Sequence, residues 1–204
     1  NLNKTKTPNF DKILEEYGAS ISEGFILEGD TNKMMYGAPS FVISTINNSS
    51  ELAKNINMDL NVCMMNPGKI TIASQEQLEK KNVTMQILAQ VSDKAFYRTD
   101  LTAQSTSKIS SDEDAAEAVV AAMFTKQNSE NNESKMILFA NTAFATNMEI
   151  PFDTQYYMYA ISVYNNEDVL LNAVSYLTQR EDNITIRKTG EAVSTYNVSL
   201  AQLQ

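Results

Sequence analysis

The sequence predicts a single domain that mixes helices and strands, and the order of its apolar segments supports this. Short runs rich in β-branched residues, such as residues 70–72 and 83–91, alternate in the manner of strands. Residues 8–17 and 168–177 instead repeat apolar side chains at helical spacing. Turns or helices separate the strands, which favours an α/β sheet over an all-β sandwich. We therefore expect a mixed, mostly parallel sheet flanked by helices, a flavodoxin-like or amidotransferase-like three-layer sandwich, either complete or incomplete at its N-terminus.

The N-terminal half predicts one helix followed by short strands. Pro8 suits the first turn of a helix, Thr7 is placed to cap it, and Gly18 ends its apolar stripe. Strands are expected at residues 19–21, 25–27, 41–43, 60–65 and 70–72, with turns at 28–32 and 66–68 and one or two helical turns at 49–55.

The C-terminal half contains the least and the most apolar segments of the chain. Residues 99–114 are dense in Ser, Thr and acids, which predicts an exposed, mobile loop. Residues 115–126 are ambiguous, because their alanines favour a helix and their valines a strand. A polar connection at residues 127–134 leads into residues 136–140, which we expect to be the most buried strand.

Residues 165–188 predict a helix, a turn and a strand in succession. Asp168 stands where an acid favours a helix N-terminus. The apolar stripe that follows, which predicts a buried helix, consists of Val169, Leu170, Ala173, Val174 and Leu177. Residues 179–183 are too polar to continue the stripe, and residues 184–186 alternate as a strand does.

This C-terminal stretch resembles the auxiliary proteins of ABC-type transport systems, a family related to the gliding-motility auxiliary protein. The matching residues are Asn166, Asp168, Asn172, Ala173, Leu177, Thr178, Arg180, Glu181, Asp182, Ile186 and Arg187. Residues 8–18, 37–44 and 135–147 also follow the order of that family, so the resemblance covers most of the chain. It favours a strand for residues 115–126.

The resemblance implies a non-catalytic extracytoplasmic domain of an ABC transporter auxiliary subunit, at the cell membrane. Its expected partners are the permease and ATPase subunits, and its anchor is a membrane helix beyond this sequence. Residues 1–188 would form the domain, and the polar residues 189–204 a juxtamembrane stalk. The alternative is an independent cell-surface module that binds a ligand or carbohydrate through its tyrosines.

Composition argues against several other classes of protein. The formal net charge of −9 and the lack of any basic run argue against nucleic acid as a partner. The chain has no histidine, which excludes a histidine-dependent hydrolase triad and removes the commonest metal ligand. Its one cysteine, Cys63, lies in an apolar run and is expected to be inert. We therefore expect no catalytic residues, no metal and no cofactor, and read the acids at 112–114 as a solvated face.

Six polar or aromatic residues are candidates for binding a ligand or partner: Asn141, Thr142, Asn147, Asp153, Tyr156 and Tyr157. Asn141 and Thr142 directly follow a predicted buried strand, where open α/β sheets form ligand crevices. The simpler alternative is that both residues only cap a turn. Asn147 and Asp153 could extend a polar cluster or face solvent. The two tyrosines belong to an aromatic group near Phe152, which could serve as a binding platform or pack in the core.

Overall fold

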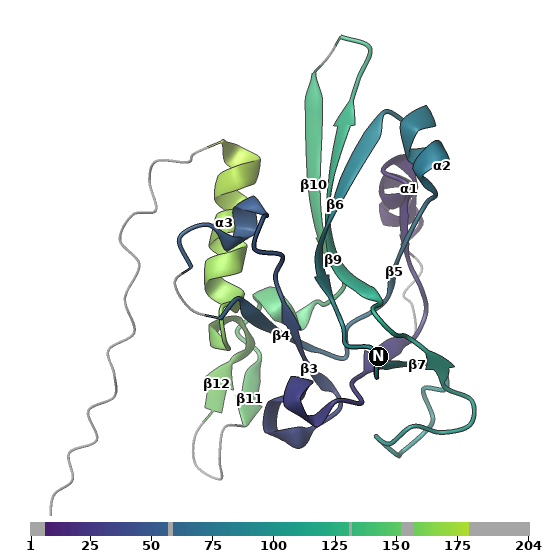
Figure 1. The fold of residues 1–204 in the computed structure, drawn as a ribbon, viewed down its shortest axis with the longest axis vertical. Coiled ribbons are helices and arrows are strands. Elements are labelled where there is room, and N and C mark those ends of the chain that lie inside the picture. The colour runs from purple at the N-terminus through teal and green to yellow at the C-terminus, as the bar shows by residue number, and fades with distance from the viewer. Residues whose placement is uncertain (1–6, 57–58, 131, 152–156, 180–204) are drawn as a thin grey trace, which may run out of the picture.

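The computed structural model describes residues 7–56, 59–130, 132–151 and 157–179 (Figure 1). The helices in these ranges are α1 (Pro8–Glu16), α2 (Gln75–Lys80) and α3 (Asn166–Thr178), with short 3₁₀ turns η1 (Thr31–Lys33), η2 (Met35–Gly37), η3 (Glu51–Ala53), η4 (Ala143–Ala145) and η5 (Ala160–Ser162). The strands are β1 (Ala19–Ile21), β2 (Phe25–Leu27), β3 (Phe41–Thr45), β4 (Asn61–Met65), β5 (Ile70–Ile72), β6 (Val83–Gln90), β7 (Phe96–Arg98), β8 (Glu113–Asp114), β9 (Val119–Gln127), β10 (Glu133–Phe139), β11 (Glu149–Pro151) and β12 (Tyr157–Tyr159).

These strands form several small sheets. Two sheets have three strands, in the orders β10-β9-β6 and β2-β7-β8, and the pairs β1-β5, β3-β4 and β11-β12 form the rest. Every strand pair in the described ranges is antiparallel.

The expected mostly parallel, flavodoxin-like or amidotransferase-like sandwich is therefore wrong, and the fold is β-rich and antiparallel. Parallel neighbours need a crossover of a dozen or more residues, usually a helix. In the described chain α2 is the one α-helix between two strands, and it joins β5 to β6, which belong to different sheets. Short turns join β9 to β10 instead, which gives an antiparallel hairpin.

The three-stranded sheet β10-β9-β6 lies between two apolar clusters, with α1 and α2 on one side and α3 with β3 and β4 on the other (Figure 1). Leu14 of α1 and Leu78 of α2 pack with Phe124 in one cluster. Val169 of α3 packs with Val42 and other buried residues in the second. The predicted strand at 115–126 is confirmed as β9, which is central to its sheet, and the predicted helix at 8–17 is confirmed as α1.

Two burial predictions are wrong, because each element contacts its neighbours on one side. The strand expected to be the most buried, β10, ends its sheet in the described chain, and its Met136 and Ile137 are only half-buried. In α3, Val169 is fully buried, but Val174 and Leu177 are 51% and 42% exposed. The side of α3 that packs on η3 and η5 therefore includes fewer of the apolar residues than the sequence pattern predicted.

Two local predictions need correction. Thr7 precedes α1, but its side chain makes no capping hydrogen bond. Residues 99–114 are mostly exposed, as expected, yet the loop is fastened by the buried carboxylate of Asp112, which pairs with Arg98. The acids at 112–114 are therefore not a uniformly solvated face.

The predicted strand at 184–186 and the predicted stalk at 189–204 lie outside the described residues. Within the described ranges, no helix is both long enough and apolar enough to cross a membrane.

Candidate functional site

The end of β10 opens into a hollow of about 480 Å³ that is lined by two of the predicted site residues, Asn141 and Thr142. Met65, the last residue of β4, and Asn66 after it form part of its wall, and Phe10 of α1 contributes an apolar side chain. The ends of β4 and β10 and the start of α1 therefore meet at this hollow.

The Asn141 side chain uses both of its polar ends to hold the chain together. Its amide nitrogen donates to the carbonyl of Met65, and its Oδ1 accepts from the Phe144 backbone nitrogen at 2.7 Å. It thereby ties β4 to η4, which is the turn-capping role weighed as the simpler alternative. Thr142 is exposed and can contact a ligand in the hollow.

The remaining predicted site residues are not gathered with this pair. Asn147 is exposed and lies two residues before β11, but it is not among the residues that line the hollow. Tyr157 is on β12 and is 64% exposed. Asp153 and Tyr156 lie outside the described residues.

Four half-exposed tyrosines lie on or near the hairpin of β11 and β12: Tyr36, Tyr157, Tyr159 and Tyr164. We call the pair on β12, Tyr157 and Tyr159, the tyrosine surface. Tyr157 and Tyr159 alternate with Met158, so they point to the face of the hairpin opposite Met158. The hydroxyl of Tyr36 donates to the sulfur of Met158 at 3.9 Å, so Tyr36 lies on the Met158 side of the hairpin, opposite Tyr157 and Tyr159.

Backbone conformation and burial give two of these tyrosines unusual settings. Tyr36 and Tyr164 have φ of 57° and 51°, a left-handed conformation that is rare for bulky residues. Desolvation raises the pKa of both hydroxyls, and the nearby Cys63 adds to the effect. Both hydroxyls therefore stay protonated at neutral pH and can donate hydrogen bonds. Such strained aromatic positions often accompany binding sites.

Cys63 is buried and packs in the same apolar cluster as Ile150 of β11. Burial raises the pKa of its thiol to about 12, so the nucleophilic thiolate is scarcely populated at neutral pH. Among the described residues, no three Cys, Asp or Glu side chains converge where they could hold a metal ion.

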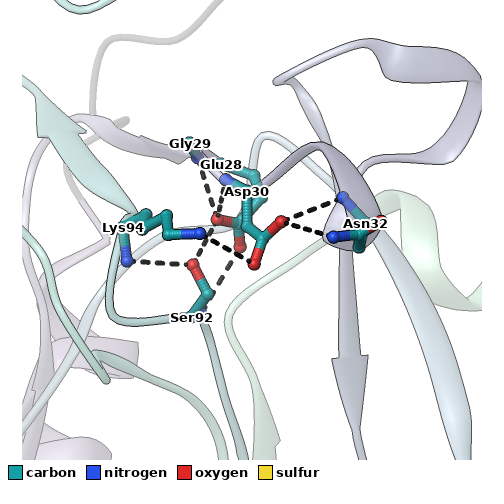
Figure 2. Close-up of polar contacts among 6 residues, drawn as sticks. All are labelled: Glu28, Gly29, Asp30, Asn32, Ser92 and Lys94. Carbon is teal, nitrogen blue, oxygen red and sulfur yellow. Dashed lines mark hydrogen bonds and ion pairs between the residues drawn. The ribbon is translucent and has the colours of Figure 1, made fainter.

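A second polar cluster, which sequence reasoning treated only as a turn, surrounds the fully buried carboxylate of Glu28 (Figure 2). Its Oε1 accepts from the backbone nitrogens of Gly29 at 2.8 Å and Asp30 at 2.9 Å, and from the Ser92 hydroxyl. Asp30 pairs with Lys94 at 3.4 Å. This network joins the end of β2 to the loop after β6. The Glu-Gly pair at residues 28–29 predicted a turn in the sequence, but nothing in that pattern predicted that the Glu28 carboxylate would be buried.

A hollow of about 330 Å³ lies beside this network, between β3 and β6. Ser44 and Ser92 line it, and Lys33 lies at its wall. The Ser44 hydroxyl is buried and has no hydrogen-bond partner among the described residues. The hollow lies between two strands, and the residues that line it do not include an acidic side chain to pair with Lys33.

Comparison with known proteins gives a likeness of fold. No protein-family model matches the sequence, and no curated protein matches it. Among solved structures, the chain is similar to the mmIFT52 N-terminal domain, with a TM-score of 0.50 and 12% sequence identity. The match covers 83% of this chain and 57% of that one, so the chain spans a little over half the length of that structure. At this identity the likeness shows the fold alone.

Proposed function

We propose that this chain is a non-catalytic interaction domain, and that it serves as the extracytoplasmic part of an ABC transporter auxiliary subunit. The tyrosine surface carries the interaction half of the proposal. Aromatic side chains are enriched at protein interfaces, because they bury a large apolar area while keeping a polar group. Tyr157 and Tyr159 present such area on a projecting hairpin (Figure 1).

The transporter half of the proposal is supported by the sequence resemblance at residues 166–187. Its partners would be the permease and ATPase subunits, and a membrane helix beyond this sequence would anchor the domain at the cell membrane. The net charge of −9 gives no support to nucleic acid as a partner.

Co-purification from native membranes tests both halves. Tagged full-length protein should recover permease and ATPase subunits that mass spectrometry identifies. Replacing Tyr157 and Tyr159 together by Ser should reduce that recovery by about tenfold, the loss expected of an aromatic hot spot. Ile13→Ser is the matched control, because Ile13 is 53% exposed on α1, away from the hairpin.

Two results would count against the proposal. Recovery of the full-length protein as a freely soluble cytoplasmic protein would exclude the transporter role. Equal recovery of the subunits by the tyrosine variant and the Ile13→Ser control would exclude the tyrosine surface.

The second candidate is an independent cell-surface module that binds carbohydrate through the same tyrosines, since flat aromatic faces can stack on sugar rings. The exposure of Tyr157 and Tyr159 on one face of the hairpin favours it. A glycan array probed with the domain distinguishes the two candidates: a robust hit that Tyr157→Ser removes would support the carbohydrate module over the transporter subunit.

A further inference from the structure

The hollow of about 330 Å³ between β3 and β6 lies between the edges of two separate sheets. The N–H of Asn47, shortly after β3, bonds to the Leu88 carbonyl of β6 at 2.8 Å and joins the two edges at that point. In the described chain β3 and β6 form no strand pair, so backbone groups that face the hollow can bind a ligand. The volume is near the lower end of the range of roughly 300 to 1,000 Å³ that ligand sites occupy, which suits a small molecule.

The backbone of Thr45 directs an N–H group toward this hollow. The N–H of Ile46 bonds to the Leu60 carbonyl, on the side of the strand where β4 lies. The N–H of Asn47 bonds to Leu88, on the opposite side, in β6. Successive N–H groups of an extended chain point to alternate sides, so the N–H of Thr45 also points toward β6. Thr45 lines the hollow, and its N–H is therefore a donor for a ligand there.

The Ser44 hydroxyl is a polar group that the fold leaves unsatisfied. Ser44 is 1% exposed and lines the hollow, yet its Oγ has no hydrogen-bond partner among the described residues. A buried hydroxyl without a partner destabilises the native state, so an alanine would serve the fold better at this position. Departures of this kind from the rules of folding are expected at functional sites, where a ligand can supply the missing hydrogen bond.

Lys33 brings a positive charge to the wall of the hollow. Its amine donates to the Thr45 hydroxyl at 3.4 Å, and that hydroxyl donates to Oδ1 of Asn61 at 2.8 Å. Among the described residues the amine forms no ion pair, and no acidic side chain lines the hollow. Side chains alternate along a strand, so Thr45 and Ser44 project from opposite faces of β3. The amine and the Ser44 hydroxyl therefore border the edge of β3 from its two faces, with the Thr45 N–H between them.

The remaining lining includes several apolar side chains: Ile43, Ile87, Leu88, Ala89 and Val91. An ammonium group without a carboxylate partner attracts an anion. The apolar side chains favour an organic anion over an inorganic one, because they gain from covering a hydrocarbon part.

We propose that the hollow between β3 and β6 binds a small organic carboxylate that carries a second polar group, such as a 2-hydroxy acid. The carboxylate accepts hydrogen bonds from the Lys33 amine and the Thr45 N–H. The second polar group pairs with the Ser44 hydroxyl. This site does not depend on the proposed function, because no residue of β11 or β12 lines the hollow.

Titration of the complete chain with L-lactate, propanoate and lactamide, followed through the backbone amides by NMR, tests the proposal. Lactate should shift the Thr45 amide with a dissociation constant of about 1 mM, which a ligand of this size can reach. Propanoate lacks the hydroxyl and lactamide lacks the charge, so each should bind about tenfold more weakly. The proposal would be overturned if lactate left the Thr45 amide unshifted well above that concentration, or if propanoate or lactamide bound as tightly as lactate.

Substitutions assign the contacts. Lys33→Gln should weaken lactate binding about tenfold, because it removes the charged donor. Lys12→Gln is the matched control: it removes the same charge from an exposed position on α1 that does not line the hollow, and it should leave lactate binding unchanged. Equal effects of the two lysine substitutions would contradict the assignment of the anion to Lys33.

Ser44→Ala separates binding from folding. It should reduce the affinity for lactate to that for propanoate, leave the affinity for propanoate unchanged, and stabilise the free domain. A gain in stability shows that the variant is folded, so its loss of lactate binding cannot come from unfolding. Unchanged lactate binding would overturn the proposal, and so would a loss of stability, because it would show that Ser44 already has a partner.

Discussion

The buried ion pair between Arg98 and Asp112 should be among the most sensitive points of the fold. The two side chains are 2% and 1% exposed, and they form two parallel bonds, Nε to Oδ1 at 2.9 Å and Nη2 to Oδ2 at 2.6 Å. Arg98 also donates to the carbonyls of Ser105 and Ser107. The pair therefore fastens the loop between β7 and β8, which contains few other buried side chains.

Removing one member leaves the other charge buried without its partner. We expect Asp112→Ala to lower the free energy of unfolding by about 3 to 5 kcal/mol, the usual cost of breaking a buried pair. Replacing both residues, Arg98→Met with Asp112→Leu, should cost less than Asp112→Ala alone, because no unpaired charge remains. Urea unfolding of the three proteins gives these values.

The same pair predicts how stability depends on pH. The hydrogen bond from Arg98 is the main cause that holds the pKa of Asp112 below its ordinary value. A carboxyl group whose pKa is lowered by folding stabilises the native state above its unfolded pKa, near 3.9, and loses this contribution as pH falls through the folded value. Wild-type protein should therefore lose stability more steeply below about pH 4 than the double variant does.

Glu76→Gln is the control, since Glu76 pairs with Lys80 on an exposed helix face and should change stability by no more than about 0.5 kcal/mol. The reasoning would be refuted if Asp112→Ala unfolded within that same margin of wild type.

Three further substitutions and one reactivity measurement test the packing. Val169→Ala should lower the free energy of unfolding, measured in urea, by about 2 kcal/mol, because this side chain is fully buried. Leu177→Ala, at an exposed site, should lower it by less than about 1 kcal/mol. The reverse order would show that α3 packs on its other face. Ser44→Ala should raise the free energy of unfolding by about 1 kcal/mol, because it removes a buried hydroxyl without a partner, and a loss of stability would reveal one. Cys63 should react with a thiol reagent at neutral pH only at the rate of unfolding, so fast labelling of the native protein would contradict its burial.

Local patterns predicted most elements but not how they assemble. The strand at residues 70–72 and the helix that ends before Gly18 follow from short-range signals, namely β-branched alternation and a glycine stop, and the structure has both. Strand direction depends on which segments pair across the chain. Residues 19–21 pair with 70–72, and nothing in either segment specifies its partner. A pattern read along the chain therefore supports strands, but not a parallel sheet.

Burial of polar residues was the second kind of error, for a related reason. Glu28 and Arg98 are charged, so single-residue preference places them at the surface. Their burial depends on partners distant in sequence, since Ser92 and Asp112 complete the hydrogen bonds that make burial tolerable. The candidate site shows the converse: Asn141 is placed where the pattern predicted, but its hydrogen bonds serve the fold.

Two asparagines of the C-terminal stretch, Asn166 and Asn172, hold α3 to its neighbours. Asn166 is buried, accepts from the Cys63 N–H at 2.9 Å and donates to the Cys63 carbonyl at 2.9 Å, so its amide pairs with β4 as another strand would. Asn172 donates to the carbonyls of Leu52 and Lys54 at 2.7 and 2.9 Å and so holds the η3 segment.

These contacts dock α3 onto its neighbours, and they explain why asparagine, which has no strong helix propensity, occupies the buried line of a helix. Asn166→Ala should therefore lower the free energy of unfolding by at least about 2 kcal/mol, because both backbone groups of Cys63 lose their partner in the core. Under the proposed function, the same substitution should leave the recovery of partner subunits per folded molecule unchanged, because Asn166 is only 1% exposed. A loss of partner binding without a loss of stability would instead make Asn166 a recognition residue, and the motif a functional rather than an architectural signature.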